Sequence, residues 1–290
     1  MTGTDNLSSR KLYVCPTPIG NLQDITLRAL EVLEDVDLIA CEDTRRTGKL
    51  LDHFDIDTPM ISYHEHNAAR RCQQILERMA EGEEVALVSD AGTPGISDPG
   101  SRLIERALES EVEIVPLPGA SALLPALVAS GLPADRFVFE GFLPRSGQER
   151  RDRLAALKRE ERTAVIYESP YRTPDTLADL AEMMPGRQLS LVREISKLHE
   201  EKIYGTTTSL AEELEADDIK GEVVLVLAGR EEESEKAGYE HLTVVEHVRA
   251  LMDHGYPKKE AIKMVAGERN LSRNEVYEEA IAIDARPRQD

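Results

Sequence analysis

The chain has 290 residues, of which 41% are hydrophobic and 31% are charged, and its formal net charge is -20. This composition is typical of a folded globular protein, and the length suits two domains with a small appendage. No apolar run approaches the ~18 residues of a membrane span, so no membrane contact is expected. The negative charge argues against a polyanionic partner unless basic residues gather locally.

The first residues contain no apolar stretch before Leu12 and no cleavage-site pattern. A secretory signal is therefore not expected, and the sequence predicts a cytoplasmic location. The cysteines, Cys15, Cys41 and Cys72, are widely spaced and form no C-x-x-C pair. We expect them to be small buried hydrophobic residues rather than disulfide partners or zinc ligands.

Five short apolar runs in the first half of the chain are predicted to be buried strands, and the segments between them have one apolar face, as helices do. This alternation predicts a parallel sheet covered on both faces, in an N-terminal α/β domain over residues 11–125. The strands are expected at Leu12–Cys15, Leu38–Cys41, Met60–Tyr63, Val85–Val88 and Val112–Val115.

Residues 126–230 are predicted to form a C-terminal α/β domain with a mixed sheet, because two of its strands follow each other without room for a helix. A buried helix is expected over Ala120–Ser130, at the boundary between the domains. The strands are expected at Phe137–Phe142, Thr163–Tyr167, Leu189–Arg193, Glu201–Tyr204 and Val223–Ala228.

Residues 231–241 contain the run EEESEK and are predicted to be an acidic linker. Residues 242–290 form a helical tail resembling a helix-turn-helix module, and Ser272 with Glu275 fits a capping box before its last helix. Any small three-helix appendage would give a similar pattern, so nucleic-acid contact is one of two interpretations. The helices are expected at Val244–Met252, Lys259–Ala266 and Arg273–Ile283.

The loop Ser89–Gly100 follows the fourth predicted strand, and in open α/β sheets such strand-end loops line the ligand crevice. Its glycines permit close approach of the backbone to a ligand, and Asp90 and Asp98 can face a cation. The chain has no G-x-G-x-x-G after its first strand, and Ser101 stands where a P-loop requires lysine, so a nucleotide-phosphate site is not expected. The alternative is a rigid turn without a ligand.

Two further loops, Pro16–Asn21 and Pro116–Ala122, follow the first and fifth predicted strands. Because parallel strands end at a common edge, all three loops are expected to lie together. Ser121 can cap the following helix while neighbouring N–H groups face a ligand carboxylate, and capping alone is an equal alternative.

The stretches PTPIGNLQDITLRAL, CEDTRRTGKLL, VSDAGTPGISDPG, PGASAL and YESPYR, in this order and spacing, resemble the tetrapyrrole methylase family, and within it the branch that methylates small-subunit ribosomal RNA. The resemblance covers residues 11 to about 283. It implies two α/β domains with S-adenosylmethionine in the cleft between them, a homodimer, and 2'-O-methylation of a cytidine in the decoding region of 16S ribosomal RNA. Porphyrinoid-modifying relatives commonly have Gly-Asp-Pro in the fourth-strand loop, whereas this chain has Gly92-Thr93-Pro94, which favours the RNA branch.

Carried over by position, the family's cofactor site draws on the strand-end loops of the first domain and on two strand ends of the second. The implied residues are Pro18, Asp90, Ala91, Gly92, Thr93, Pro94, Gly95, Ile96, Ser97, Ser121, Ala122, Tyr167, Glu168, Ala228 and Gly229.

Methyl transfer by in-line displacement depends on positioning and on excluding water, and it needs no metal. A ribose hydroxyl is a poor nucleophile, so a nearby base would help, and the candidates are Glu42 and Asp43 after the second strand. Lys197 could hold a phosphate or lower the pKa of the hydroxyl. The alternatives are helix capping for Asp43 and a surface ion pair with Glu194 for Lys197.

The candidate RNA contacts lie after the second and third strands and in the segment from Gly141 to Arg162, whose seven basic and four acidic residues give it a net charge of +3. We expect Arg145–Arg162 to be a mobile basic arm over the cleft. Tyr63, Tyr167 and Tyr171 could stack on bases, and the alternative is that they belong to the core. A two-histidine metal site is conceivable, but no other ligand cluster supports it. The candidate contacts are Arg45, His64, His66, Arg145, Arg150, Arg151 and Arg153.

Two other functions remain open from the sequence. One is a methyltransferase of the same fold that acts on a porphyrinoid or a protein residue. The other is a non-catalytic RNA-binding factor for ribosome assembly, which would leave three glycine-containing loops at one sheet edge unexplained.

Overall fold

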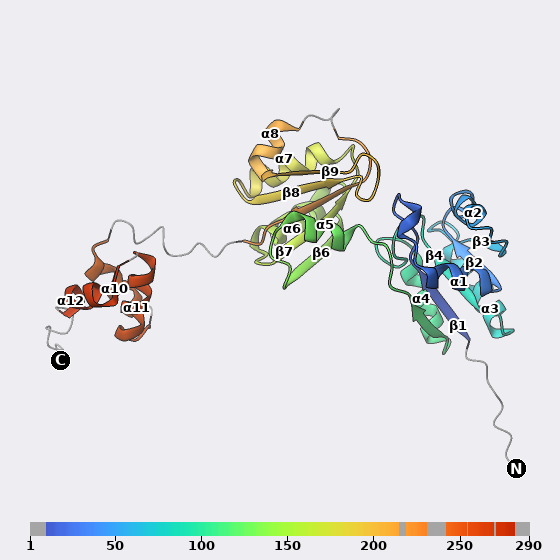
Figure 1. Ribbon diagram of the computed structural model, residues 1–290, viewed down its shortest axis with the longest axis horizontal. Helices are drawn as coiled ribbons and strands as arrows, with labels where there is room; N and C mark the ends of the chain where they lie inside the picture. The colour runs from blue at the N-terminus through green and yellow to red at the C-terminus, as the bar shows by residue number, and fades with distance from the viewer. Residues whose placement is uncertain (1–9, 215–218, 231–241, 254, 270, 282–290) are drawn as a thin grey trace, which may run out of the picture. The chain divides into compact units, whose positions relative to one another are not determined.

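The computed structural model describes residues 10–214, 219–230, 242–253, 255–269 and 271–281 (Figure 1). The chain divides into two compact units, residues 1–230 and residues 231–290. The first unit contains two five-stranded sheets, each with its own helices.

The first sheet is parallel throughout, with strand order β3-β2-β4-β1-β5. This confirms the predicted parallel sheet, and every predicted strand is present within one residue at either end. The bounds are β1 (Lys11–Cys15), β2 (Leu38–Cys41), β3 (Met60–Ser62), β4 (Val85–Val88) and β5 (Glu113–Pro116).

Helices cover both faces of this sheet. The face with Ile39 and Val88 packs against α1 (Leu27–Asp35) and α2 (Thr44–His53), which contribute Leu33 and Leu51. The opposite face packs against α3 (Ala68–Ala80) and α4 (Gly100–Glu109). The three cysteines are buried and unpaired, as expected, and burial raises the pKa of the Cys15 thiol to about 12.

The second sheet has the order β6-β7-β10-β8-β9 and is mixed, as predicted. Strand β6 is parallel to β7, β10 is antiparallel to both β7 and β8, and β9 is antiparallel to β8. Val223 at the start of β10 therefore lies opposite Glu168 at the end of β7. The bounds are β6 (Phe137–Phe142), β7 (Thr163–Glu168), β8 (Gln188–Arg193), β9 (Glu201–Thr206) and β10 (Val223–Leu227).

One face of the second sheet packs against α6 (Gly147–Arg159), α7 (Thr173–Met183) and α8 (Thr207–Glu213). The other face packs against α5 (Leu123–Ser130) through Ala126 and Leu127. The expected boundary near residue 125 falls inside α5. Since α5 packs on the second sheet, the chain passes from one sheet to the other before Leu123.

The second unit contains α10 (Val244–Asp253), α11 (Lys258–Glu268) and α12 (Arg273–Ala280), packed around Val248, Val265 and Val276. Ser272 and Glu275 form the predicted capping box before α12. The predicted acidic linker and the last two residues of the third predicted helix lie outside the described residues. Within the described part of the chain, no helix has the length and apolar character to cross a membrane.

Candidate active site

Three loops at the carboxyl ends of β1, β4 and β5 are joined by hydrogen bonds. Thr17 and Gly92 exchange two backbone hydrogen bonds of 2.9 Å each, and the Thr17 hydroxyl donates to the Ser89 carbonyl at 2.9 Å. The Thr93 hydroxyl donates to the Ala120 carbonyl at 3.1 Å. Gly92 has a φ of +83°, which favours glycine. These bonds confirm that the three loops predicted to share an edge lie together.

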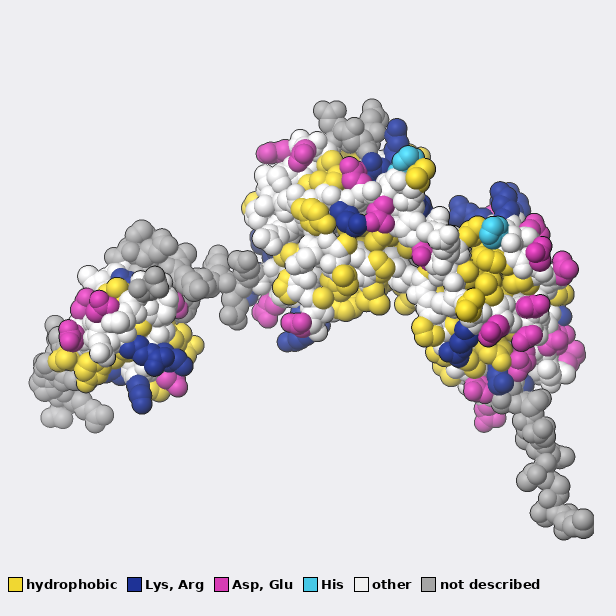
Figure 2. Space-filling model, viewed as in Figure 1, with side chains coloured by type: hydrophobic (Ala, Val, Ile, Leu, Met, Phe, Trp, Pro, Cys, Tyr) yellow, Lys and Arg dark blue, Asp and Glu magenta, His cyan; other side chains and the backbone are white. Residues whose placement is uncertain are grey.

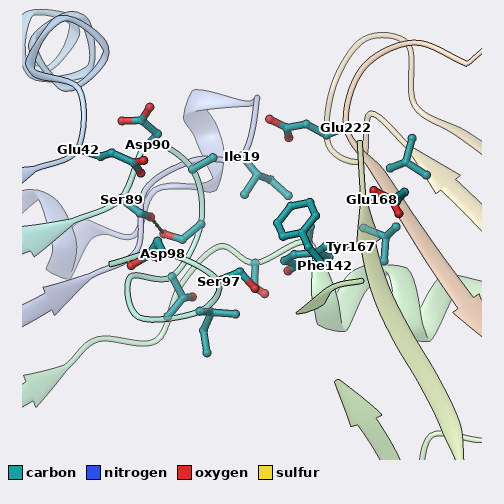
Figure 3. A pocket seen from close by; sticks show the side chains of 18 of the residues that line it. Ile19, Glu42, Ser89, Asp90, Ser97, Asp98, Phe142, Tyr167, Glu168 and Glu222 are labelled. Carbon is teal, nitrogen blue, oxygen red and sulfur yellow. Dashed lines mark hydrogen bonds between the residues drawn. The ribbon is translucent and has the colours of Figure 1, made fainter. Parts of the chain in front are cut away.

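Beside these loops is a pocket of about 260 Å³ that is lined by residues from both sheets of the first unit (Figure 3). One wall is acidic, and the other combines aromatic and aliphatic side chains with Glu168 and Glu222. The lining residues are Ile19, Glu42, Arg46, Ser89, Asp90, Ala91, Gly92, Thr93, Ile96, Ser97, Asp98, Ser121, Ala122, Phe142, Tyr167, Glu168, Glu222, Val223 and Val224.

The acidic wall carries Glu42, Asp90 and Asp98 (Figure 3). Asp90 accepts a 3.0 Å hydrogen bond from the backbone N–H of Asp43 and pairs with Arg46 at 3.5 Å. Burial raises the pKa of Glu42, and the charges of Asp90 and Asp98 add to this effect. With Arg46 facing three carboxylates, this wall favours a cationic ligand.

Asp98 also shapes the loop that bears it. Its carboxylate accepts hydrogen bonds from the backbone N–H groups of Gly95, at 2.9 and 3.0 Å, and of Gly100, at 2.7 Å. Burial nevertheless raises the pKa of Asp98, because it outweighs these bonds. Asp98 therefore holds the turn between β4 and α4 as well as lining the pocket.

The second wall is formed mainly by Phe142 from β6 and Tyr167 from β7 (Figure 3). The Tyr167 ring meets Phe139 and Phe142 edge to face, with ring centroids 4.9 and 5.8 Å apart. Burial raises the pKa of the Tyr167 hydroxyl, and a hydrogen bond with Ser121 opposes the shift. This contact links the aromatic wall to the loop after β5.

Most residues expected in the cofactor site line this pocket, as does the candidate base Glu42. Pro18, Pro94 and Gly95 belong to the same loops without lining it. The Glu168 carboxylate accepts from the Ser169 backbone N–H at 2.9 Å and from the Thr176 hydroxyl at 2.8 Å, so it is engaged by residues that follow β7. The expected residues that line the pocket are Asp90, Ala91, Gly92, Thr93, Ile96, Ser97, Ser121, Ala122, Tyr167 and Glu168.

Ala228 and Gly229 do not lie where they were expected. The Ala228 N–H donates to the carbonyl of Gln188 at the start of β8, and Gly229 packs against the backbone of Glu161, just before β7. The resemblance to the family had assigned them to the cofactor site by position. Since β10 is antiparallel to β7, its first residues lie at the pocket and its last residues at the opposite edge of the sheet.

Asp43 caps α2 rather than lining the pocket. Its carboxylate accepts from the Arg45 backbone N–H at 2.9 Å and pairs with the Arg45 guanidinium at 2.8 Å. Hydrogen bonds from the Arg45 side chain and backbone lower the pKa of Asp43. Of the two carboxylates expected to act as the base, only Glu42 lines the pocket.

Lys197 does not line the pocket, but it forms an ion pair with Glu222, which does. Its ammonium group binds Glu194 at 2.8 Å and Glu222 at 3.3 Å, and Glu222 lines the pocket. Burial lowers the pKa of Lys197, but hydrogen bonds with Glu194 and attraction to Glu222 raise it to a greater extent. Lys197 is therefore protonated at neutral pH and acts as a cation rather than a base.

The basic segment forms α6 in the structure instead of a mobile arm. Arg150 is only 8% exposed, and its guanidinium binds Asp179 at 2.6 and 2.7 Å and donates to the Pro144 carbonyl at 3.0 Å. Arg150 was expected to contact RNA, and these bonds instead hold it between α6 and α7. Arg151 binds Gln148, Arg153 pairs with Glu140, and Arg145 is exposed.

His64 and His66 follow β3 and do not line the pocket. Their ring centroids are 6.0 Å apart, and the His64 Nε2 is 3.0 Å from the Asn67 side-chain amide. No group of His, Cys, Asp and Glu in the described ranges could hold a metal ion.

The sequence did not identify Arg46, Phe142 or Glu222 as pocket residues. Arg46 follows Arg45 directly. Arg45 was a candidate because it lies in the first turn of a helix after a strand end, and the same position could have identified Arg46. Phe142 and Glu222 depend on a strand irregularity and on strand direction, for which the sequence gives no local signal.

A family model described as Tetrapyrrole (Corrin/Porphyrin) Methylases matches residues 11–212 of the chain. A Synechocystis sp. protein named Ribosomal RNA small subunit methyltransferase I is 45% identical, with 94% of this chain and 98% of the relative covered. A protein of the same name from Halalkalibacterium halodurans is 44% identical, with 92% and 93% covered.

Solved structures of low sequence identity share the fold. Diphthine synthase matches with a TM-score of 0.60 and 16% identity, over 75% of this chain and 89% of that one. Uroporphyrin-III C-methyltransferase from Thermus thermophilus, complexed with S-adenyl homocysteine, matches with a TM-score of 0.53 and 18% identity, over 75% and 97%. With the sequence matches, this likeness identifies the chain as a member of the tetrapyrrole (corrin/porphyrin) methylase family.

Proposed function

We propose that this protein transfers a methyl group from S-adenosylmethionine to the 2'-oxygen of a cytidine in the decoding region of 16S ribosomal RNA, in the small ribosomal subunit. The observation that carries this proposal is the match, over more than nine-tenths of the chain, to relatives named for methylation of small-subunit ribosomal RNA. The homodimer and the cytoplasmic location expected from the sequence remain predictions.

The pocket residues fit the cofactor that we propose. S-adenosylmethionine carries a positive sulfonium and a positive ammonium group, and the acidic wall of Glu42, Asp90 and Asp98 favours such charges. Ala91, Gly92 and Thr93 line the pocket and have small side chains or none, so their backbone can approach a ligand. A relative in fold is complexed with S-adenyl homocysteine, the demethylated form of this cofactor.

When bound, the cofactor supplies an electrophilic methyl group, and the residues of the chain prepare the ribose hydroxyl. Glu42 is suited to accept the hydroxyl proton, because it lines the pocket and burial raises its pKa, which makes it a stronger base than an exposed carboxylate. Arg46 is exposed and pairs with Asp90 at 3.5 Å, so it is suited to bind RNA phosphate, whereas Lys197 is held by Glu194 and Glu222.

The proposal is tested by methyl transfer from radiolabelled S-adenosylmethionine to small subunits from cells that lack this protein. Nucleoside analysis should yield labelled 2'-O-methylcytidine. If the protein binds the cofactor but labels neither subunits nor free ribosomal RNA, the proposal is wrong. A porphyrinoid or protein substrate would then be the better hypothesis.

A further inference from the structure

Strand β6 contains an irregularity that changes the direction of one aromatic side chain. Phe139 lies opposite Val165 in β7, but Gly141, not Glu140, lies opposite Ile166, and Phe142 lies opposite Tyr167. Side chains alternate along a regular strand, so Phe139 and Phe142 would normally point to opposite faces. The extra residue brings both rings to the face that carries Tyr167, and both contact its ring.

This bulge places a partly uncovered phenyl ring at the pocket. Phe142 is 52% exposed although it lines the pocket, and Ile96 on the loop after β4 is 43% exposed. An aromatic face left open to water beside a polar site is a common means of binding a flat, apolar partner. The edge-to-face contact with Tyr167 supports the Phe142 ring from one side and leaves ring surface free.

Two arginines bind the backbone carbonyl groups of the segment that follows Phe142. The Arg172 guanidinium donates to the Leu143 carbonyl at 2.6 Å, and Arg150 donates to the Pro144 carbonyl at 3.0 Å. Each guanidinium is itself fixed by a carboxylate, Glu168 for Arg172 and Asp179 for Arg150. The backbone directly after Phe142 is therefore fixed before any ligand binds, which reduces the entropy lost on binding.

A second hollow of about 440 Å³ lies next along this segment, lined by Arg145, Arg150, Ser169, Tyr171, Arg172 and Asp175. Tyr171 is 93% exposed. Arg145 makes no hydrogen bond or ion pair with any residue that the structure describes. With Arg150 and Arg172 paired to carboxylates, the charges left are those of Arg145 and Asp175, so the hollow offers stacking more than phosphate neutralisation.

We propose that Phe142 is a stacking platform for the base of the target nucleotide, and that Tyr171 and Arg145 receive the adjacent nucleotide. This inference rests on the proposed function. Proteins that read single-stranded RNA stack unpaired bases on aromatic side chains, a contact that does not need net positive charge. The base would lie on the aromatic wall, while its ribose faces the opposite wall that carries Glu42.

The test compares Phe142→Ala, Phe142→Leu and Phe142→Tyr in the full-length protein. Stacking contributes ~1–3 kcal/mol per base, so Phe142→Ala should lower kcat/KM for small subunits about 5- to 150-fold. Phe142→Leu keeps an apolar side chain without the ring and should lose nearly as much, whereas Phe142→Tyr should retain activity near that of the wild type. The Kd for S-adenosylmethionine, measured by calorimetry, should change less than about twofold. The matched control is Tyr204→Ala, which removes an exposed ring on β9 and should leave kcat/KM unchanged.

Three outcomes would overturn the platform. Phe142→Leu could match the wild type, which would make the contact merely apolar. Phe142→Ala could weaken cofactor binding as much as turnover, which would assign the ring to the cofactor. Both substitutions could leave kcat/KM unchanged while the wild type methylates subunits, which would remove the platform and leave the proposed function intact. Failure of the wild-type protein itself to methylate subunits would instead contradict the proposed function, and the platform with it.

Discussion

Glu42 lies in a place that disfavours the ionised form of its carboxyl group. It is partly buried and shares the pocket wall with Asp90 and Asp98, and these effects raise its pKa above the ordinary value of 4.5. A carboxyl group with a raised pKa lowers folding stability as the pH rises above the ordinary value, and the full cost is present once the pH exceeds the raised pKa. Such a cost is more often found at sites of chemistry than elsewhere on a protein surface.

We predict that Glu42→Gln lowers kcat for methyl transfer about 10²- to 10⁴-fold, the range typical of a lost general base. The same substitution should raise the melting temperature at pH 7, because it removes a charge that opposes folding there. Scanning calorimetry and single-turnover transfer measure the two effects. The matched control is Asp43→Asn, which keeps a side chain able to cap α2 and should lose far less activity. A parallel loss in both variants would contradict a base role specific to Glu42.

The pH dependence of the wild type follows from the same shift. Glu42 accepts a proton only when ionised, so kcat should fall as the pH decreases through its raised pKa. In Glu42→Gln this acid limb should be absent and the residual rate flat across that range. A wild-type profile without an acid limb would argue against Glu42 as the proton acceptor.

At the scale of elements, the bulge in β6 depends on Gly141, whose φ is +63°. Gly141→Ala should cost about 1–2 kcal/mol in stability, since an L side chain is strained in the left-handed region. Its Cβ would also come within 3.3 Å of the Ser97 hydroxyl at the pocket. If the bulge aims Phe142, this variant should also lower kcat/KM for subunits.

Gly147→Ala is the matched control for this substitution, because Gly147 has a φ of +85° but nothing within 4 Å of the added carbon. It should lose comparable stability in thermal unfolding while retaining methyl transfer. Equal transfer by the two alanine variants would show that the geometry of the bulge does not govern turnover.

The contact between α6 and α7 leads to a prediction about the stability of the fold, not about RNA binding. Arg150→Ala should lower the free energy of unfolding by about 2–4 kcal/mol, because it leaves Asp179 and the Pro144 carbonyl without their partner. Arg151→Ala, one residue along the same helix and exposed, should change it by less than about 0.5 kcal/mol. Urea unfolding of both variants measures this contrast. Equal stability in the two would mean that the Arg150 contacts contribute little.

These elements also show what the sequence could predict. Runs such as VALV in β4 and VVLVL in β10 are long enough and apolar enough to identify buried strands. An apolar run reads the same in either direction, however, so it does not show that β10 is antiparallel to β7. The family resemblance had assigned Ala228 and Gly229 to the cofactor site, and no local pattern corrected this or identified Glu222.

The charged residues of α6 show that the sequence also does not reveal which side chains turn inward. A run of arginines and glutamates predicts a solvated surface, and only the packing of α6 on α7 reveals that Arg150 turns inward to Asp179. The bulge that turns Phe142 toward the pocket is likewise set by pairing with β7. The strand-end loops, by contrast, were predictable because their glycines, prolines and aspartates follow strands directly in the sequence.

For the whole molecule, the net charge of -20 must be reconciled with a polyanionic substrate. The face shown in Figure 2 carries many Asp and Glu side chains among scattered Lys and Arg. Phosphate neutralisation over a broad surface would not explain binding to such a protein. Base stacking at an aromatic wall needs no excess of cations, so it offers a way for an acidic enzyme to hold RNA at its site.

The division of the chain into two units predicts that they can be separated. The residues that line the pocket all belong to the first unit, and the helices of the second pack around their own core of Val248, Val265 and Val276. A chain ending at Arg230 should therefore bind S-adenosylmethionine with the Kd of the full chain, measured by calorimetry, and should unfold cooperatively.

If residues 242–290 contact RNA, as the helix-turn-helix pattern suggests, the shortened chain should show a higher KM for subunits and an unchanged Kd for the cofactor. The control is the full-length chain with Glu42→Gln, which should lose kcat rather than subunit affinity. A shortened chain that folds but loses cofactor affinity would show that the second unit supports the pocket, and the prediction that the first unit binds the cofactor alone would be wrong.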